Sequence, residues 1–472
     1  MTARALTLAP SAECGGLAPY ASYRDSGLPW LGAIPSHWDV RRNGRLFAER
    51  VETGFEDLPI LEVSLRTGVR VRDMENGARK QQMADRSKYK RAAKGDIAYN
   101  MMRMWQGAVG VAPEDGLISP AYVVARPFPG VDPRYFTYLF RTSAYTREVN
   151  KFSRGIVSDR NRLYWDEFKQ MPSAFPPTGE QARIAEYLDA HGRRTARLIR
   201  NKRRLIGLLN EQRQAIINRA VTRGLNPAAP MKPTGIDWMP EVPVHWEVKR
   251  IKNVVREKDT RSGTGQHELL SLTRKHGLVR HSDVASRPAS AADFTNYKVC
   301  LPGEIVMNRM QAWSGMFGLA SEEGMVSPDY AVFVPTGDCD AEYLATLFKT
   351  PIFVQQFAIR SQGIGDGFNR LYTPTMGGIS IVAPGIIEQR QILEHIEDET
   401  HELSQLQIRL ESETALIREY RERLIADVVT GKLDVRHIEI VAPADEPAID
   451  EDDALDEDLD AEGTDELAED ED

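Results

Sequence analysis

A tandem repeat is the feature that most constrains this chain. Residues 30–227 and 238–435 share one architecture at a near-constant offset of 208, which slips to 207 only around Ser64 and Ser271. Pairs that keep the offset include Trp30 and Trp238, His37 and His245, Trp38 and Trp246, Tyr89 and Tyr297, Gly107 and Gly315, Asn161 and Asn369, and Glu180 and Glu388. Each copy has the size of a domain and exceeds a solenoid unit, so the chain is a tandem duplication.

Two similar domains imply pseudo-twofold symmetry. A pseudo-twofold protein suits a target with two related halves, and duplex DNA is the commonest such target. The length of 472 residues allows each copy to bury its own core.

The charge of the chain is unevenly distributed. The net charge is −9, but residues 441–472 contain 17 Asp or Glu residues and no Lys or Arg. The remaining chain has 60 basic and 52 acidic residues, a net charge of +8. We expect the acidic tail to be disordered, because it has too little apolar surface to offset its ordering entropy. It either competes with DNA for the basic body or only solubilises the protein. Unchanged non-specific DNA affinity after its deletion would exclude competition.

Composition also indicates the cellular compartment and the redox state of the cysteines. The sequence has no run of 18 apolar residues and no convincing signal pattern, so we expect a cytoplasmic protein without a membrane partner. Cys14, Cys300 and Cys339 are widely spaced and form no CxxC pair, which favours reduced thiols over disulfides or a zinc site.

Each copy is predicted to have a globular part followed by a long helix. In the first copy, apolar runs bounded by Gly and Pro predict strands within 59–65, 96–102 and 122–127, and a helical stretch follows over 132–152. The predicted fold class is α+β, with two tandem mixed α/β domains. The predicted segments are an N-terminal extension (1–20), a first domain (21–176), a first spacer helix (177–225), a linker (226–233), a second domain (234–384), a second spacer helix (385–436) and the tail (441–472).

Both long helices have apolar residues at alternating steps of four and three, which is the coiled-coil heptad pattern. The first seam is Ile184, Leu188, His191, Thr195, Leu198, Lys202, Leu205, Leu209, Gln212 and Ile216. The second is Ile392, Ile396, Glu399, Leu403, Leu406, Leu410, Glu413, Ile417, Tyr420 and Leu424. Polar members in each seam predict that neither helix stands alone. Antiparallel packing of the two would hold the globular domains a fixed distance apart.

Motifs for catalysis are missing from the sequence. It has no Gly-rich methyltransferase loop with an Asn/Asp-Pro-Pro-aromatic tetrapeptide, and no GxxxxGK[ST]. Asp237, Glu247 and Lys249 imitate a nuclease pattern, but the first copy lacks it. His267, His276 and His281 have no counterparts either, and a surface loop is favoured over a metal site. We therefore predict a recognition protein without a catalytic, cofactor or metal site.

Several motifs resemble the specificity subunit of type I restriction-modification systems. The first is Pro176-Pro177-Thr178-Gly179-Glu180-Gln181-Ala182-Arg183-Ile184, repeated as Glu388-Gln389-Arg390-Gln391-Ile392 after Pro384, with Gly385 in place of the second Pro. The helix ends, Ala220-Val221-Thr222-Arg223-Gly224-Leu225 and Asp427-Val428-Val429-Thr430-Gly431-Lys432-Leu433-Asp434, are similar to the closing motif of that family. Blocks 94–100 and 119–122 are also similar. The resemblance covers residues 25–436.

The resemblance implies a non-catalytic subunit with two target recognition domains, each reading one half of a bipartite asymmetric sequence in double-stranded DNA. It implies that the paired helices set the gap and dock two modification subunits. S-adenosylmethionine would be bound by those subunits, and ATP and Mg by separate restriction motor-nuclease subunits.

The duplication itself suggests which residues read DNA. If the halves read different sequences, identical positions are framework or phosphate contacts, and polar positions that differ in matched loops are candidate base readers. The first matched loops are 100–106 and 308–314. Arg suits guanine and Gln suits adenine, so the favoured readers are Arg103, Gln106, Arg309 and Gln311. The shared Asn100 and Asn308 are DNA-binding candidates expected to frame the loop, together with Trp105 and Trp313.

The second matched loops are 154–160 and 362–368. Candidate base readers there are Arg154, Ser158, Arg160, Gln362 and Asp366. The shared Arg162 and Arg370 are expected to anchor phosphates. A structural salt bridge is the alternative for each arginine, and core packing is the alternative for the Met and Trp residues.

Two other functions are compatible with the sequence. One is a tandem-domain coiled-coil scaffold that binds protein without sequence-specific DNA binding. The other is an enzyme whose site lies in one copy only or between the copies.

Overall fold

The computed structural model describes residues 17–72, 86–155, 161–274, 276–284, 293–363 and 369–440. The acidic tail lies outside the described residues. The chain divides into two compact units: unit 1 comprises Met1–Arg204 and Glu411–Asp472, and unit 2 comprises Leu205–Leu410. Each unit therefore contains one globular part and a segment of both long helices.

Unit 1 contains twelve strands among its described residues: β1 (Tyr23–Asp25), β2 (Ala33–Pro35), β3 (Asp39–Arg42), β4 (Phe47–Glu49), β5 (Leu61–Ser64), β6 (Gly68–Val71), β7 (Lys90–Ala92), β8 (Ile97–Asn100), β9 (Val109–Val111), β10 (Gly116–Ile118), β11 (Tyr122–Pro127) and β12 (Pro172–Phe175). Its helices are α1 (Pro133–Phe140), α2 (Ser143–Phe152), α3 (Trp165–Phe168) and the start of α4 (Thr178–Arg223). The three strands expected from the sequence are confirmed as β5, β8 and β11.

Unit 2 repeats this order: β13 (Met231–Ile236), β14 (Met239–Pro243), β15 (Glu247–Arg250), β16 (Val255–Lys258), β17 (Leu270–Thr273), β18 (Gly277–Arg280), β19 (Lys298–Cys300), β20 (Ile305–Asn308), β21 (Phe317–Leu319), β22 (Gly324–Val326), β23 (Tyr330–Pro335) and β24 (Ser380–Ala383). Its helices are α5 (His281–Val284), α6 (Ala341–Phe348), α7 (Pro351–Arg360), α8 (Thr373–Gly377) and the start of α9 (Ile386–Val429). Strand β13 begins inside the segment 226–233 that the sequence analysis assigns to a linker.

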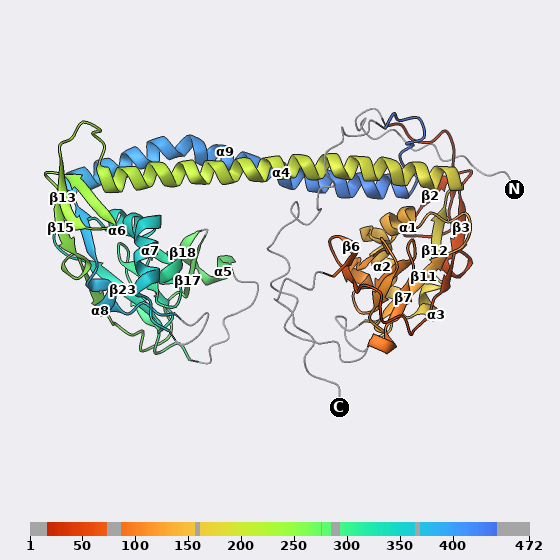
Figure 1. Cartoon of the computed structure of the whole chain (residues 1–472), viewed down its shortest axis with the longest axis horizontal. Helices are drawn as coiled ribbons and strands as arrows, with labels where there is room; N and C mark the ends of the chain where they lie inside the picture. Colours follow the sequence, from red (N-terminus) through yellow and green to blue (C-terminus); the bar gives the residue numbers. More distant parts are fainter. Residues whose placement is uncertain are drawn as a thin grey trace. The chain divides into compact units, whose positions relative to one another are not determined.

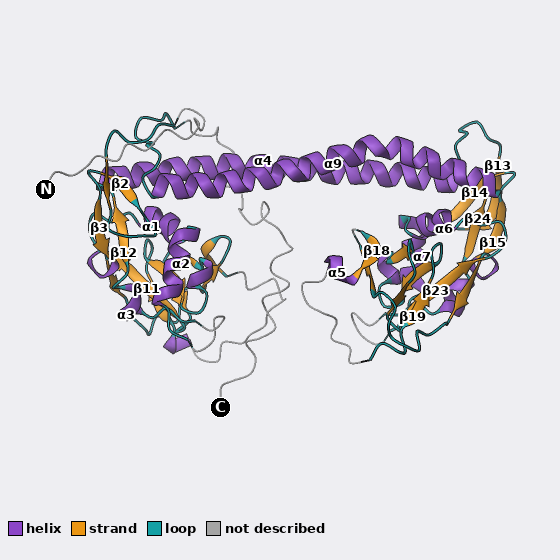
Figure 2. Cartoon of the chain, turned by 180° about the vertical axis from the view of Figure 1, so that it is seen from behind, coloured by secondary structure: helices purple, strands orange, loops and turns teal. Residues whose placement is uncertain are grey.

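A four-stranded antiparallel sheet is the centre of each unit, in the order β4-β11-β8-β9 in unit 1 and β16-β23-β20-β21 in unit 2. Alternate residues of β11 face two cores: Val123 and Ala125 pack with the helices, whereas Val124 packs with Leu61 and Val69 of the β5-β6 hairpin. Both faces of the sheet are buried, which explains why its strands read as continuous apolar runs. Figure 2 shows the helices and strands of each unit.

The long helices take part in these cores. In unit 1, Ile184 and Leu188 of α4 share a core with Leu424 and Val428 of α9, and Figure 1 shows the two segments side by side. In unit 2, Val221 near the end of α4 shares a core with Ile392 near the start of α9.

The heptad assignment is wrong for part of each helix. Leu198 and Leu205 are 45% and 41% exposed, and Ile199 is buried instead. On α9, Leu406 and Tyr420 are 38% and 41% exposed, whereas Thr400 and Thr414 are buried in place of the assigned Glu399 and Glu413. The physical reason is that a straight α-helix has 3.6 residues per turn, so a strict 3.5-residue stripe drifts off the buried face.

Two other sequence expectations need correction or extension. The single helical stretch over 132–152 is two helices, because Thr142 has an extended backbone and its side chain accepts a hydrogen bond from the backbone N–H of Tyr145, starting α2. Leu17 and Tyr20, assigned to the N-terminal extension, are buried in the core of unit 1.

Candidate nucleic-acid interface

The loop after β8 in unit 1 is held by its shared residues. The side-chain oxygen of Asn100 accepts a hydrogen bond of 2.9 Å from the backbone N–H of Met102, and Nε1 of Trp105 donates to the carbonyl of Met102 at 3.0 Å. Gly107, in the left-handed region with φ of +89°, ends the short helix η3 (Met104–Gln106). This loop is called loop A.

Unit 2 builds its loop A in the same way. The side-chain oxygen of Asn308 accepts from the backbone N–H of Met310 at 3.0 Å, and Nε1 of Trp313 donates to the carbonyl of Met310 at 2.9 Å. Gly315 has φ of +82° at the end of η5 (Ala312–Ser314). The shared residues thus form hydrogen bonds within the loop, as the comparison of the copies leads us to expect.

The residues that differ between the two A loops have different exposures. Gln106 in unit 1 and Gln311 in unit 2 are exposed, and Arg103 is partly exposed. Met104 and Ala312, which occupy matched positions, are fully buried. The buried positions fix the loop to the core, whereas Gln106 and Gln311 lie at the surface.

The described ends of the second predicted loop lie beside the first loop in each unit. In unit 1, Arg154 and Arg162 exchange two backbone hydrogen bonds of 2.9 Å, and the N–H of Leu163 donates to the carbonyl of Met101 in loop A at 2.9 Å. The segment from Arg154 to Arg162 is called loop B. The structure therefore joins the described ends of loop B to loop A, which lies about 50 residues earlier in the sequence.

The corresponding loops meet through the same bonds in unit 2. Gln362 and Arg370 exchange backbone hydrogen bonds of 2.9 and 2.8 Å, and the N–H of Leu371 donates to the carbonyl of Arg309 at 2.9 Å. Ser158 and Arg160 of the first copy, and Asp366 of the second, lie outside the described residues.

The arginines at the base of loop B differ in their partners. Arg154 forms an ion pair with Glu167 although its side chain is 75% exposed, and the side chain of Arg162 is also exposed. Arg370 lies 3.7 Å from Asp329. The first copy has Ala121 at the position of Asp329. The shared arginines therefore face different electrostatic surroundings in the two units.

Arg309 belongs to an ion-pair network that the sequence analysis missed. Its Nη2 atom lies 2.5 Å from Oε1 of Glu257, and the same carboxylate oxygen lies 3.4 Å from Nζ of Lys298. Lys298 is only 2% exposed and also pairs with Asp259 at 3.2 Å. This arrangement favours a structural salt bridge for Arg309, the alternative left open above, and its contact with a base remains a prediction.

A repeated lysine and glutamate pair could have revealed the network. Lys90 and Glu49 occupy the matched positions in the first copy. Nζ of Lys90 donates to the carbonyl of Tyr122 at 2.8 Å, and burial lowers the pKa of Lys90. The first copy has Met101 where the second has Arg309, so only unit 2 places an arginine in this network.

The Glu-Gln motif connects the start of each long helix to the globular part of the same copy through hydrogen bonds. Glu180 accepts a hydrogen bond from Nε1 of Trp38 at 3.0 Å and lies 2.8 Å from Nε2 of His37. The side chain of Gln181 accepts from the backbone N–H of Asp132 and donates to the carbonyl of Pro176. Glu388 and Gln389 form the equivalent bonds in unit 2.

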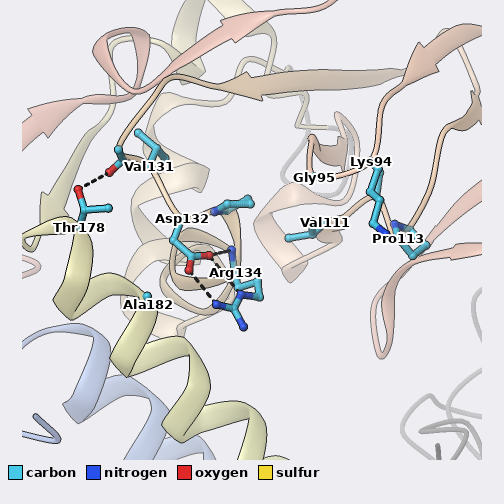
Figure 3. A pocket seen from close by; sticks show the side chains of 12 residues that line it. Lys94, Gly95, Val111, Pro113, Val131, Asp132, Arg134, Thr178 and Ala182 are labelled. Carbon is cyan, nitrogen blue, oxygen red and sulfur yellow. Dashed lines mark hydrogen bonds and ion pairs between the residues drawn. The ribbon is translucent and has the colours of Figure 1, made fainter.

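A shallow pocket of about 550 Å³ lies at the first turn of α4 in unit 1. Figure 3 shows Arg134 beside Asp132 at its centre, with Thr178 donating to the carbonyl of Gly130 at its edge. Arg134 pairs with Asp132 at 3.0 Å and with Asp189 at 3.1 Å. The guanidinium of Arg134 at the centre of the pocket is therefore paired with two carboxylates of the chain itself.

The described residues contain no group of three or more His, Cys, Asp or Glu side chains placed to hold a metal ion. Within the same residues, no helix combines the length and apolar character needed to cross a membrane.

Comparison with known proteins supports the fold. No family model matches the sequence, and no curated protein matches it. A chain solved to explain complex assembly and conformational transition of the type I R-M system is similar, with 15% identity and a TM-score of 0.60, over 85% of this chain and 99% of that one.

Two further structures were found. The HsdS subunit of Thermoanaerobacter tengcongensis has 14% identity and a TM-score of 0.43, covering 85% of this chain and 98% of that one. The type I restriction-modification S subunit of M. genitalium has 13% identity and a TM-score of 0.34, covering 84% and 96%. The match with a TM-score of 0.60 shows that this chain shares its fold with a chain of the type I restriction-modification system.

Proposed function

We propose that this chain is the DNA-recognition subunit of a type I restriction-modification complex, and that each unit reads one half of a bipartite target. The observation that carries the proposal is the pair of joined loops in each unit. Their frame is identical, since Asn100 and Asn308 form the same bonds, whereas their polar positions differ. One frame with two sets of polar side chains suits a protein that reads two different half-sites.

The matched positions Arg103 and Gln311 illustrate the difference. An arginine forms two hydrogen bonds with guanine, and a glutamine forms two with adenine, each pair discriminating by about 1–3 kcal/mol. The shared Arg162 and Arg370 would neutralise phosphates, which contributes affinity without sequence preference.

The long helices would form an antiparallel coiled coil with pseudo-twofold symmetry. Helix α4 has 46 residues, a length of about 69 Å at 1.5 Å per residue. Such helices would fix the gap between the half-sites, near one helical turn or about 10 bp, and dock two modification subunits. S-adenosylmethionine would be bound by those subunits, and ATP and Mg by the restriction motor-nuclease subunits, so that this chain does not itself catalyse a reaction.

Selection from random DNA tests the proposal. The chain, produced together with its modification subunits, is used to select duplexes from a random library, and the bound sequences are read. We expect two short sequences separated by a fixed gap. Arg103→Ala should relax the first half only, and Gln311→Ala at the matched position should relax the second half only.

Two results would contradict the proposal. If each variant damages both half-sites equally, the loops do not read bases separately. If no sequence is enriched, the chain is better described as a coiled-coil scaffold for protein partners.

A further inference from the structure

A basic segment of α4 has no counterpart in the second copy. Residues 193–204 contain seven basic side chains and no acidic one: Arg193, Arg194, Arg197, Arg200, Lys202, Arg203 and Arg204. The matched residues 401–412 of α9 contain Arg409, Glu402 and Glu411 instead. Residues that serve both halves recur in both copies, as Glu180 and Glu388 do. The basic segment is therefore a feature of α4 alone and is not part of the repeated framework.

Several side chains of the basic segment point to solvent. Arg193, Arg194, Arg197 and Arg204 are exposed. Lys202 forms an ion pair of 2.5 Å with Glu413 of α9. The facing α9 residues 411–421 contain three acidic residues, Glu411, Glu413 and Glu419, and two basic ones, Arg418 and Arg421. The facing α9 residues 411–421 therefore have a net charge of −1, against +7 for the basic segment.

The guanidinium of Arg200 gives a second reason to expect an anion at the basic segment. Its Nε and Nη2 atoms are buried and have no hydrogen-bond acceptor among the described residues. Nε of Arg421 on α9 is in the same situation. A partly buried guanidinium without an acceptor is costly, and an anion bound nearby would reduce that cost.

The last described residues before the acidic tail lie against α4, about two to three turns from the basic segment. Ile438 packs on the core of unit 1, and its carbonyl accepts a hydrogen bond from the guanidinium of Arg183 on α4. The description ends at residue 440, and residues 441–472 follow with 17 acidic side chains and no basic ones. Along the helix, Arg193 is about 15 Å and Arg204 about 32 Å from Arg183. A chain of 32 residues has an average reach of about 30 Å.

We propose that residues 441–472 bind the exposed face of the basic segment, residues 193–204 of α4. The interaction is electrostatic, so it weakens as salt is added. The bound tail covers the basic segment and keeps non-specific nucleic acid off this part of α4. The proposal does not depend on sequence-specific DNA reading by the loops.

The test measures distances between nitroxide labels in the full chain by pulsed electron paramagnetic resonance. One label is placed at Leu459→Cys and the other at Leu198→Cys. The native cysteines are first replaced by Cys14→Ser, Cys300→Ala and Cys339→Ala, and the replaced protein must have the same melting temperature as the parent. Leu198 is 45% exposed next to Arg197. In the control pair, Leu406→Cys replaces Leu198→Cys and the label at position 459 is kept. Leu406 is 38% exposed and occupies the matched position on α9.

A short distance between positions 459 and 198, absent for the control pair, supports the proposal. It should disappear in about 1 M NaCl, where the Debye length is about 3 Å. It should also disappear with the combined changes Arg193→Gln, Arg194→Gln, Arg197→Gln and Arg204→Gln. Equally broad distances for both pairs, unaffected by salt, overturn the proposal.

A binding measurement with a non-specific duplex gives a second readout. A chain ending at Ile440 should bind this duplex several-fold more tightly than the full chain, and the four Arg→Gln changes should remove that gain. If those changes weaken DNA binding equally with and without residues 441–472, the occupant of the basic segment is DNA and the tail proposal is wrong.

Discussion

The phenolic hydroxyl of Tyr135 donates a hydrogen bond of 2.9 Å to the backbone carbonyl of Val429, the last residue of α9. Tyr343, 208 residues after Tyr135, donates in the same way to the carbonyl of Val221 near the end of α4, at 3.2 Å. Each globular part is therefore completed by the end of the helix that belongs to the other copy. The end of each long helix is thus part of the core around the other copy's globular part.

Removing this hydroxyl should destabilise unit 1. Tyr135 is fully buried, so Tyr135→Phe leaves the Val429 carbonyl without its donor and should lower the free energy of unfolding by about 1–3 kcal/mol. Denaturant unfolding monitored by circular dichroism measures the change. Tyr343→Phe makes the equivalent change in unit 2 and should lower the free energy of unfolding by a similar amount. A loss near zero for both would mean that these bonds do not hold the helix ends.

Glu180 and Glu388, near the starts of the two long helices, should contribute unequally to the free energy of unfolding. Glu180 accepts from Trp38 and also from the hydroxyl of Tyr20 at 2.5 Å, whereas Glu388 has no equivalent of Tyr20, because the matched residue is Ala228. Glu180 is 7% exposed, so Glu180→Gln should lower the free energy of unfolding by about 1–3 kcal/mol, and Glu388→Gln by less. Thermal melting of the two variants checks the order. The reverse order would contradict the assigned role of Tyr20.

His191 should make stability depend on pH. Burial lowers the pKa of His191, and the nearby Arg421 and Arg194 lower it further. The unfolded chain therefore binds a proton at a higher pH than the folded chain, and this residue reduces the free energy of unfolding as pH falls below about 6.5. His191→Gln should remove that part of the pH dependence, measured by unfolding between about pH 7.5 and 5. The control is His395→Gln, at an exposed position of α9. An unchanged pH dependence in His191→Gln would contradict this prediction.

Glu257 should control how Arg309 takes part in DNA binding. The ion pair of 2.5 Å holds the guanidinium of Arg309 within unit 2. Glu257→Gln removes the negative charge and frees Arg309, so the affinity for duplexes carrying the second half-site should rise several-fold and become more sensitive to salt. Glu49→Gln at the matched position in the first copy, which has Met101 in place of Arg309, is the control. Equal effects of both changes would show that Arg309 is not responsible.

Much of the fold follows from the sequence because the repeat marks shared positions. The strands β5, β8 and β11 were predictable from apolar runs bounded by Gly and Pro. The residues shared between copies, such as Asn100 and Trp105, proved to hydrogen-bond the loop. Comparing the copies also identified the two loops that the structure joins.

Other features could not be read from the repeat. Tyr20 has no counterpart in the second copy, so nothing in the comparison marks it as a core residue. Leu198 is exposed because a straight helix has 3.6 residues per turn, whereas the heptad pattern assumes 3.5. The bond between Tyr135 and Val429 joins residues 294 positions apart, and the spacing of apolar residues does not indicate such a pairing.

The most direct test of the proposed function is a genome-wide map of methylated adenines in the source cell, with the gene intact, deleted, or carrying Arg103→Ala. The proposal predicts a bipartite motif with a fixed gap whose methylation is lost on deletion. It also predicts that Arg103→Ala relaxes only one half of that motif. A map that is the same in all three strains, in cells shown to produce the modification subunits, would contradict it.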